Sequence, residues 1–162
     1  MLGGLRKLVH DFSCSKAGGI FYYVVCRRVD QLLIPLSGGR LSMGPPGRTA
    51  LITTTGARSG KPRQASLAFL WRGDDMVVIA SKGGHPHHPA WYHNMLAQPR
   101  VHVLYRDGEE DRIAREASGD ERDKLFAEAA ATYANFAAYQ ERAVHRKIPV
   151  MILSKLEGDR TL

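Results

Sequence analysis

Two basic, glycine-containing segments hold the residues of this sequence that are best suited to chemistry. The first spans residues 53–63 and reads TTTGARSGKPR, and the second spans residues 80–84 and reads ASKGG. Each lies at the end of an apolar, strand-like run. Glycine lets backbone N–H groups approach a ligand closely, and lysine and arginine supply positive charge. Together the segments predict a site for an anion, which we interpret as part of a phosphorylated cofactor.

Familiar phosphate-binding motifs do not account for these segments. A P-loop requires GxxxxGK[ST], but the spacing between Gly56 and Gly60 is one residue too short, and Pro62 stands where the Mg²⁺-binding hydroxyl would be. No GxGxxG follows a strand-like run, so the usual dinucleotide fingerprint is missing. No Ser-His-Asp or Cys-His set has a recognisable spacing. The sequence therefore predicts chemistry carried by a cofactor rather than nucleotide hydrolysis.

Short strands are the elements expected to position both segments. Strand-like runs cover residues 49–55, 63–71, 76–80, 100–105, 110–117 and 148–153. Residues 72–75 predict a tight turn, and antiparallel pairing across it would bring Arg63 close to Lys82. The strands do not alternate regularly with helices, which argues against a doubly wound fold. We expect a mainly β, α+β domain built as an antiparallel barrel with peripheral helices.

Helices are predicted between and after the strands. A short helix is expected over residues 89–96 and another over residues 135–145. Between them, Ser118 followed by Glu121 matches a capping box, which would open an alanine-rich helix.

Aromatic and histidine residues near these helices each allow two interpretations. Tyr133, Phe136 and Tyr139 recur every three residues, as either a helix-packing stripe or an aromatic wall over a substrate pocket. Trp91 is open between core packing and stacking on a flat ring. Four histidines lie between residues 85 and 93, but prolines separate them and no cysteine is near. We expect a ligand-facing loop there and no metal site.

Charge and length limit the remaining interpretations. The chain has 162 residues with a net charge of +7, which favours anionic partners. We divide it into an N-terminal helical arm and linker, residues 1–48, and a barrel domain, residues 49–162. No RNP-like or helix-turn-helix pattern is present, so nucleic acid is not expected as a partner.

The N-terminal arm contains an apolar run that is too short and too charged to span a membrane. It predicts an amphipathic helix over residues 17–33, with Arg27 and Arg28 on the polar side. This helix either packs on its own domain or makes a peripheral contact with the membrane. We interpret Cys14 and Cys26 as reduced thiols and expect a cytoplasmic protein, at the inner face of the cell membrane if the helix binds there, as a monomer or homodimer.

The combined motifs resemble the deazaflavin (F420)-dependent nitroreductase and quinone reductase family of actinobacteria. The resemblance rests on residues 51–63, 80–84, 89–94 and 98–99, in order and spacing, and on Ile148-Pro149-Val150 as the terminal strand. It implies a split β-barrel of the flavin-reductase type and reduced coenzyme F420 as hydride donor. The phosphate and oligoglutamate tail of that coenzyme agree with the basic composition.

The resemblance also implies functional roles for individual residues. Cofactor-binding residues would be Thr55, Gly56, Arg58, Ser59, Lys61, Arg63, Ser66, Ala80, Ser81, Lys82, Gly83, Gly84 and Trp91. Of these, Arg58, Arg63 and Lys82 would hold the phosphate, and Ser66, Ala80 and Trp91 would flank the ring. Catalytic residues facing the substrate would be Ser81, Tyr133 and Tyr139.

The function implied is hydride transfer from reduced F420 to an electron-poor acceptor such as a quinone, an activated alkene or a nitro compound. Phe136 and Ala68 stand where the nitroimidazole-activating member has tyrosines. Activity on bicyclic nitroimidazoles is therefore not implied, whereas reduction of quinones or enones depends less on those phenols. The alternative is a non-catalytic split-barrel carrier that binds F420, flavin mononucleotide or a fatty acid.

Overall fold

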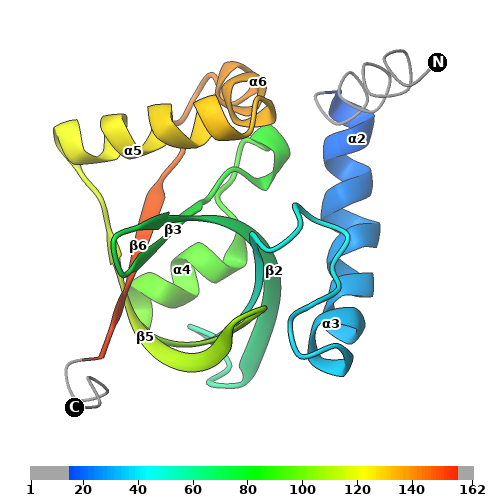
Figure 1. Ribbon diagram of the computed structural model, residues 1–162. Coiled ribbons are helices and arrows are strands. Elements are labelled where there is room, and N and C mark those ends of the chain that lie inside the picture. The colour runs from blue at the N-terminus through cyan, green and yellow to red at the C-terminus, as the bar shows by residue number, and fades with distance from the viewer. Residues whose placement is uncertain (1–14, 157–162) are drawn as a thin grey trace.

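Six strands of the described chain form one closed antiparallel barrel. The computed structural model describes residues 15–156. The strands are β1 (Thr49–Thr55), β2 (Pro62–Arg72), β3 (Asp75–Ile79), β4 (Arg100–Tyr105), β5 (Gly108–Glu116) and β6 (Val150–Lys155). They close in the order β1-β2-β3-β6-β5-β4 (Figure 1). The predicted mainly β architecture with peripheral helices is confirmed, and so is the hairpin between β2 and β3.

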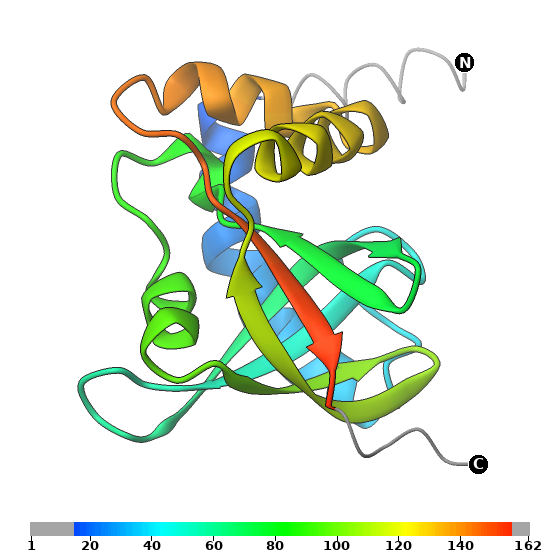
Figure 2. The same ribbon diagram turned by 90° about the vertical axis from the view of Figure 1, so that its left-hand side faces the viewer.

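Helices cover the barrel on several sides. They are α2 (Lys16–Phe21), the π-helical segment η1 (Tyr22–Cys26), α3 (Arg27–Leu36), α4 (Ala90–Ala97), α5 (Gly119–Thr132) and α6 (Asn135–Arg142), with a short turn η2 (Lys82–Gly84). The N-terminal helices form a rod beside β2, while α5 and α6 lie together across one end of the molecule (Figures 1 and 2). Trp91, Tyr92 and Met95 of α4 join the buried core inside the barrel.

Strands β3 and β6 are apolar on both faces because each face meets a different layer. Met76 and Val78 point into the barrel core, whereas Val77 and Ile79 pack in a second cluster with α5 and α6. Strand β6 alternates in the same way. Burial on both faces explains the nearly continuous apolar runs from which these strands were predicted.

The buried Arg112 connects several strands at one end of the barrel through hydrogen bonds. The side chain of Arg112 is 0% exposed, and its Nε donates a hydrogen bond to the Glu110 carboxylate at 2.9 Å. Its Nη1 donates to the carbonyl oxygens of Asp74 and Leu153, each at 2.8 Å. The guanidinium also lies 5.2 Å from the ring centre of Trp71. The charge thereby links β5 to β6 and to the β2–β3 turn, and every partner is polar or aromatic.

The capping box predicted at Ser118 is wrong in its hydrogen bonds. Ser118 does stand at the N-cap of α5 with extended backbone, but its hydroxyl makes no capping bond. The Glu121 carboxylate instead accepts two hydrogen bonds from Arg115, at 2.7 and 2.8 Å. A bidentate arginine pair satisfies that carboxylate on the surface, so it does not return to the helix start.

The N-terminal helix places a polar residue inward and apolar residues outward. Cys26, Asp30 and Ile34 are buried, and α3 packs on β1 and β2. Large apolar side chains exposed along the rod are Phe21, Val24, Val25, Val29, Leu32 and Leu36. Within the described residues, no helix is both long enough and apolar enough to cross a membrane. The division of the chain at residue 48 stays a prediction.

We expect His102 to make stability depend on pH. Its Nδ1 lies 2.7 Å from Asp111 and its Nε2 lies 2.8 Å from Glu109, and hydrogen bonds to these carboxylates raise the pKa of His102. The charged form is favoured in the folded state, so this stabilisation is complete below the unfolded pKa and is lost as pH rises through the folded one. The difference in unfolding free energy between wild type and His102→Gln should shrink from pH 6 to pH 8. A pH-independent difference in urea titrations would contradict this role.

Candidate functional site

The turn after β3 has an uncommon backbone conformation. Lys82, Gly83 and Gly84 all have positive φ, at 48°, 64° and 79°. Glycine accepts such angles at no cost, whereas for Lys82 they carry strain. Gly84 is buried, and a Cβ there would lie 2.7 Å from the carbonyl oxygen of Tyr139. Glycine at this position therefore lets α6 pack directly on the turn.

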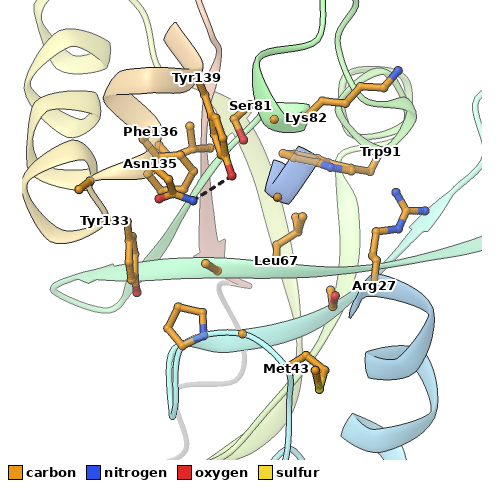
Figure 3. A pocket seen from close by; sticks show the side chains of 18 residues that line it. Arg27, Met43, Leu67, Ser81, Lys82, Trp91, Tyr133, Asn135, Phe136 and Tyr139 are labelled. Carbon is orange, nitrogen blue, oxygen red and sulfur yellow. Dashed lines mark hydrogen bonds between the residues drawn. The ribbon is translucent and has the colours of Figure 1, made fainter. Parts of the chain in front are cut away.

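A cavity of about 370 Å³ lies between this turn, β2 and α6 (Figure 3). We call it the apolar chamber. Strand β2 contributes Ser66, Leu67 and Ala68, and the turn contributes Ser81, Lys82 and Gly83. The end of α5 contributes Tyr133, and α6 contributes Asn135, Phe136 and Tyr139. A chamber of this size suits a small organic ligand.

A second, more open depression of about 1170 Å³ continues from the chamber along the β1–β2 turn. We call it the basic groove. Arg58, Ser59 and Arg63 line it, together with residues of α4. The buried Asn94 of α4 accepts a hydrogen bond from the Ala57 N–H at 3.0 Å. That bond fixes the start of the turn that carries Arg58 and Ser59.

Three side chains line both depressions: Arg27, Lys82 and Trp91. Figure 3 shows Trp91 and Arg27 along one side of the chamber and the aromatic residues of α6 on the other. Chamber and groove therefore meet at two cations and one indole. A ligand with a flat apolar part and an anionic part could occupy both.

Nine of the predicted cofactor residues line the chamber or the groove. They are Gly56, Arg58, Ser59, Arg63, Ser66, Ser81, Lys82, Gly83 and Trp91. Arg63 and Lys82 both line the basic groove, and the close approach of the two side chains stays a prediction. Thr55, Lys61, Ala80 and Gly84 line neither: Ala80 is buried in the barrel core and Lys61 is exposed in the turn. Their roles stay predictions.

Phe136 and Tyr139 of α6, together with Tyr133 at the end of α5, both pack and line the chamber. Phe136 sits edge-on between Tyr133 and Tyr139, with ring centres 5.8 and 6.1 Å away. The Tyr133 hydroxyl donates a hydrogen bond to the Phe69 carbonyl at 3.1 Å, and burial raises the pKa of Tyr133. Asn135 Nδ2 donates to the Tyr139 hydroxyl at 3.1 Å, which orients that phenol (Figure 3).

Ser66 brings an unsatisfied polar atom to the chamber wall. The residue is 2% exposed, and its Oγ has no hydrogen-bond partner among the described residues. A buried hydroxyl without a partner costs about 1–3 kcal/mol. A ligand with a polar edge would remove that cost.

Comparison with known proteins identifies the family. The family model for F420H(2)-dependent quinone reductases matches residues 27–155. The F420H(2)-dependent quinone reductase Rv1261c of Mycobacterium tuberculosis is 35% identical over 121 residues, which cover 73% of this chain and 79% of that protein. The chain belongs to the F420H(2)-dependent quinone reductase family. It is accordingly an oxidoreductase whose cofactor is reduced coenzyme F420.

Solved structures agree with this assignment. A structure described as an F420-H2 dependent reductase, FDR-A, is 42% identical and superimposes with a TM-score of 0.60, covering 66% of this chain and 94% of that one. A structure described as a domain-swapped dimer is 37% identical with a TM-score of 0.64, covering 78% and 96%. These matches confirm the predicted split-barrel fold of the F420-dependent family.

In this family member, sequence reasoning missed residues contributed by the N-terminal rod and the loop after it. Arg27 lines both depressions, and Met43, Gly44 and Pro45 line the chamber. Buried Asp30 accepts a hydrogen bond from the Met43 N–H at 2.6 Å, which fastens that loop over the chamber. A carboxylate at helical spacing from the apolar Cys26 and Ile34 was the signal that could have found this contact.

The histidine-rich loop lies beside the groove. Nδ1 of His88 lies 2.9 Å from Arg146 Nη1, so this nitrogen accepts the bond and the proton of the neutral ring is on Nε2. Burial first, and then the Arg146 charge, lower the pKa of His88. Among the described residues, no group of three or more His, Cys, Asp or Glu side chains is arranged to hold a metal ion.

Proposed function

We propose that the apolar chamber holds the deazaflavin ring and the electron acceptor, and that the basic groove holds the phosphate-containing tail. The acceptors would be quinones, with activated alkenes and nitro compounds as further members of the same electron-poor class. The observation that carries this proposal is the continuity of an apolar chamber with a cation-lined groove through Arg27, Lys82 and Trp91.

The residues present fit the coenzyme. Ser66 Oγ is a buried hydroxyl without a partner, which a polar edge of the ring would satisfy. Arg58, Arg63 and Lys82 supply positive charge along the groove for a phosphate. When bound, reduced F420 supplies the hydride for the reaction. The chain's own part is to orient both reactants and to exclude water from the chamber.

We infer that Tyr139 and Ser81 donate hydrogen bonds to the acceptor oxygen as negative charge develops on it. Both line the chamber, and Asn135 holds the Tyr139 phenol in place. Accepting the Asn135 bond uses a lone pair of the phenol oxygen and not its proton. The Tyr133 proton is already directed at the Phe69 carbonyl, so Tyr133 is the weaker candidate. Donors aimed at developing charge lower the barrier more than they favour ground-state binding.

The direct test adds reduced F420 and menadione to the protein and follows coenzyme absorbance. Oxidation well above the background rate is expected. Coenzyme binding without oxidation would overturn the proposed reaction. The same assay with an enone and a nitroarene decides the wider acceptor range.

Replacing each tyrosine in turn with phenylalanine separates the roles of Tyr139 and Tyr133. Tyr139→Phe should lower kcat for menadione by roughly tenfold to a hundredfold, below the loss of about 10²–10³ seen for a well-placed oxyanion donor. Tyr133→Phe should cost less, because it removes a hydrogen bond to backbone and leaves the acceptor donors in place. Equal losses in the two variants would restore Tyr133 as a donor.

We also propose that the outward face of the N-terminal rod contacts the membrane. Val25, Val29, Leu32 and Leu36 follow helical spacing and are 42%, 37%, 68% and 86% exposed. Exposed Arg28 and Arg40 flank this face, and anionic headgroups would pair with them. Contact there would bring a lipid-soluble quinone close to the chamber. Whether the chain is a monomer or a homodimer stays a prediction.

A vesicle assay tests this contact. Leu32→Glu with Leu36→Glu should reduce co-sedimentation with phosphatidylglycerol vesicles about tenfold or more, because each buried leucine contributes about 1.5–3 kcal/mol. The matched control, Leu96→Glu with Val144→Glu, adds the same charge at other exposed apolar sites. Equal sedimentation of both double variants would contradict the membrane contact, and so would failure of the wild type to sediment.

A further inference from the structure

Arg146 donates hydrogen bonds to backbone carbonyl oxygens of the turn that carries Ser81 and Lys82. Its Nε donates to the His85 carbonyl at 2.8 Å, its Nη1 to the Ala80 carbonyl at 3.2 Å, and its Nη2 to the Ser81 carbonyl at 2.7 Å. One side chain thus holds backbone oxygens on both sides of the turn. Arg146 lines neither the chamber nor the groove.

The turn needs such support because its backbone is strained. Lys82 is the single non-glycine residue with positive φ in the described part of the chain. Strain of this kind persists only where surrounding contacts hold it. Since the carbonyl and the following N–H of a trans peptide point in opposite directions, the bond to Ser81 also turns the Lys82 N–H away from Arg146.

The backbone of Arg146 is itself fixed by α5 and α6. Gln140 Nε2 donates to the Arg146 carbonyl at 2.9 Å, and Gln140 Oε1 accepts from the Ile148 N–H at 2.9 Å. Arg122 donates to that same amide oxygen at 3.1 Å and to the Ile148 carbonyl. The guanidinium therefore reaches the turn from a rigid base.

We propose that Arg146 is a positioning residue: it holds the Ser81–Lys82 turn so that the serine faces the acceptor and the lysine faces the phosphate. This role rests on the proposed function of those two residues. Lysine cannot replace it, because a single ammonium cannot serve three carbonyl oxygens in the fixed geometry of a guanidinium fork.

The first test is amide hydrogen exchange in the coenzyme-free protein. Arg146→Ala and Arg146→Lys should speed exchange at residues 81–85 by about tenfold or more, while the barrel strands keep wild-type protection. The matched control Arg115→Gln removes an exposed arginine whose carboxylate partner is Glu121, and it should leave the turn unchanged. Wild-type exchange at the turn in Arg146→Lys would overturn the positioning role, even if the alanine variant does not fold.

The second test is coenzyme affinity, followed by deazaflavin fluorescence. Both Arg146 variants should raise the F420 dissociation constant about tenfold, and millimolar ethylguanidinium should restore part of the affinity of Arg146→Ala. Ethylguanidinium is related to a denaturant and would not stabilise a generally weakened fold. Recovery of coenzyme affinity would therefore show that the lost contact is local to the turn. Unchanged affinity would refute the proposal, whereas a wild type that binds no coenzyme would instead refute the proposed function, and hydrogen exchange would still decide the role of Arg146.

Discussion

Replacing Lys82 and Arg63 together with alanine is expected to weaken coenzyme binding by roughly 2–4 kcal/mol, since hydrogen bonds to charged groups contribute about 1.5–3 kcal/mol each. The dissociation constant for F420 should rise about thirtyfold to several hundredfold. Both cations line the basic groove, and Lys82 also lines the chamber. Titration of deazaflavin fluorescence at fixed ionic strength measures the change.

A charge-matched control separates local contact from overall attraction. Arg72→Gln with Arg115→Gln also removes two positive charges, from exposed ion pairs with Glu128 and Glu121. Such surface pairs contribute about 0–1 kcal/mol to stability, so this variant should fold and bind coenzyme almost as wild type does. If both double variants lose affinity equally, the groove does not hold the phosphate and the net charge alone steers the ligand.

The strands and the turns that carry the two basic segments could be predicted because their signals are local. Val77 and Ile79 belong to a continuous apolar run. Such a run is typical of a strand that is buried on both faces, so the strand could be recognised from the sequence alone. The hairpin of β2 and β3 follows from one turn, and it places Arg63 and Lys82 on one groove. Pairing between strands that are neighbours in the sequence therefore accounts for much of the candidate site.

The contributions missed by sequence reasoning come from contacts between distant segments. Arg27 reaches the chamber because α3 packs on β1 and β2, and no local pattern encodes that packing. The Asp30 bond to Met43 and the Arg146 bonds to the turn join residues 13 and more than 60 positions apart. The capping box at Ser118 failed for a local reason, because Arg115, six residues before Glu121, binds that carboxylate.

Part of the positive net charge lies on arginines that support the fold. Arg112 and Arg122 are buried and satisfied by backbone carbonyls or side chains, and Arg146 supports a turn. These arginines stabilise the fold and do not face a ligand. The attraction for anions therefore rests on the few cations along the groove, which is why removing two of them should have a large effect.

The largest effect on stability is expected from Glu110→Gln. This change leaves the fully buried Arg112 without its carboxylate partner and weakens the acceptor of the Tyr105 hydroxyl bond. Breaking a buried ion pair from one side costs about 3–5 kcal/mol, a large part of the 5–15 kcal/mol that holds a domain folded. The melting temperature should fall by roughly 6–20 °C, at about 2–4 °C per kcal/mol. Calorimetry or urea unfolding measures it.

The neighbouring carboxylate supplies the control. Glu109 is 61% exposed and pairs with His102 on the barrel surface, so Glu109→Gln should change stability by no more than about 1 kcal/mol. Replacing both partners, Glu110→Leu with Arg112→Met, should recover part of the stability, because no charge is then left buried. Equal stability of Glu110→Gln and Glu109→Gln would mean that Arg112 is satisfied by the Asp74 and Leu153 carbonyls alone, and that the ion pair does not hold the barrel end.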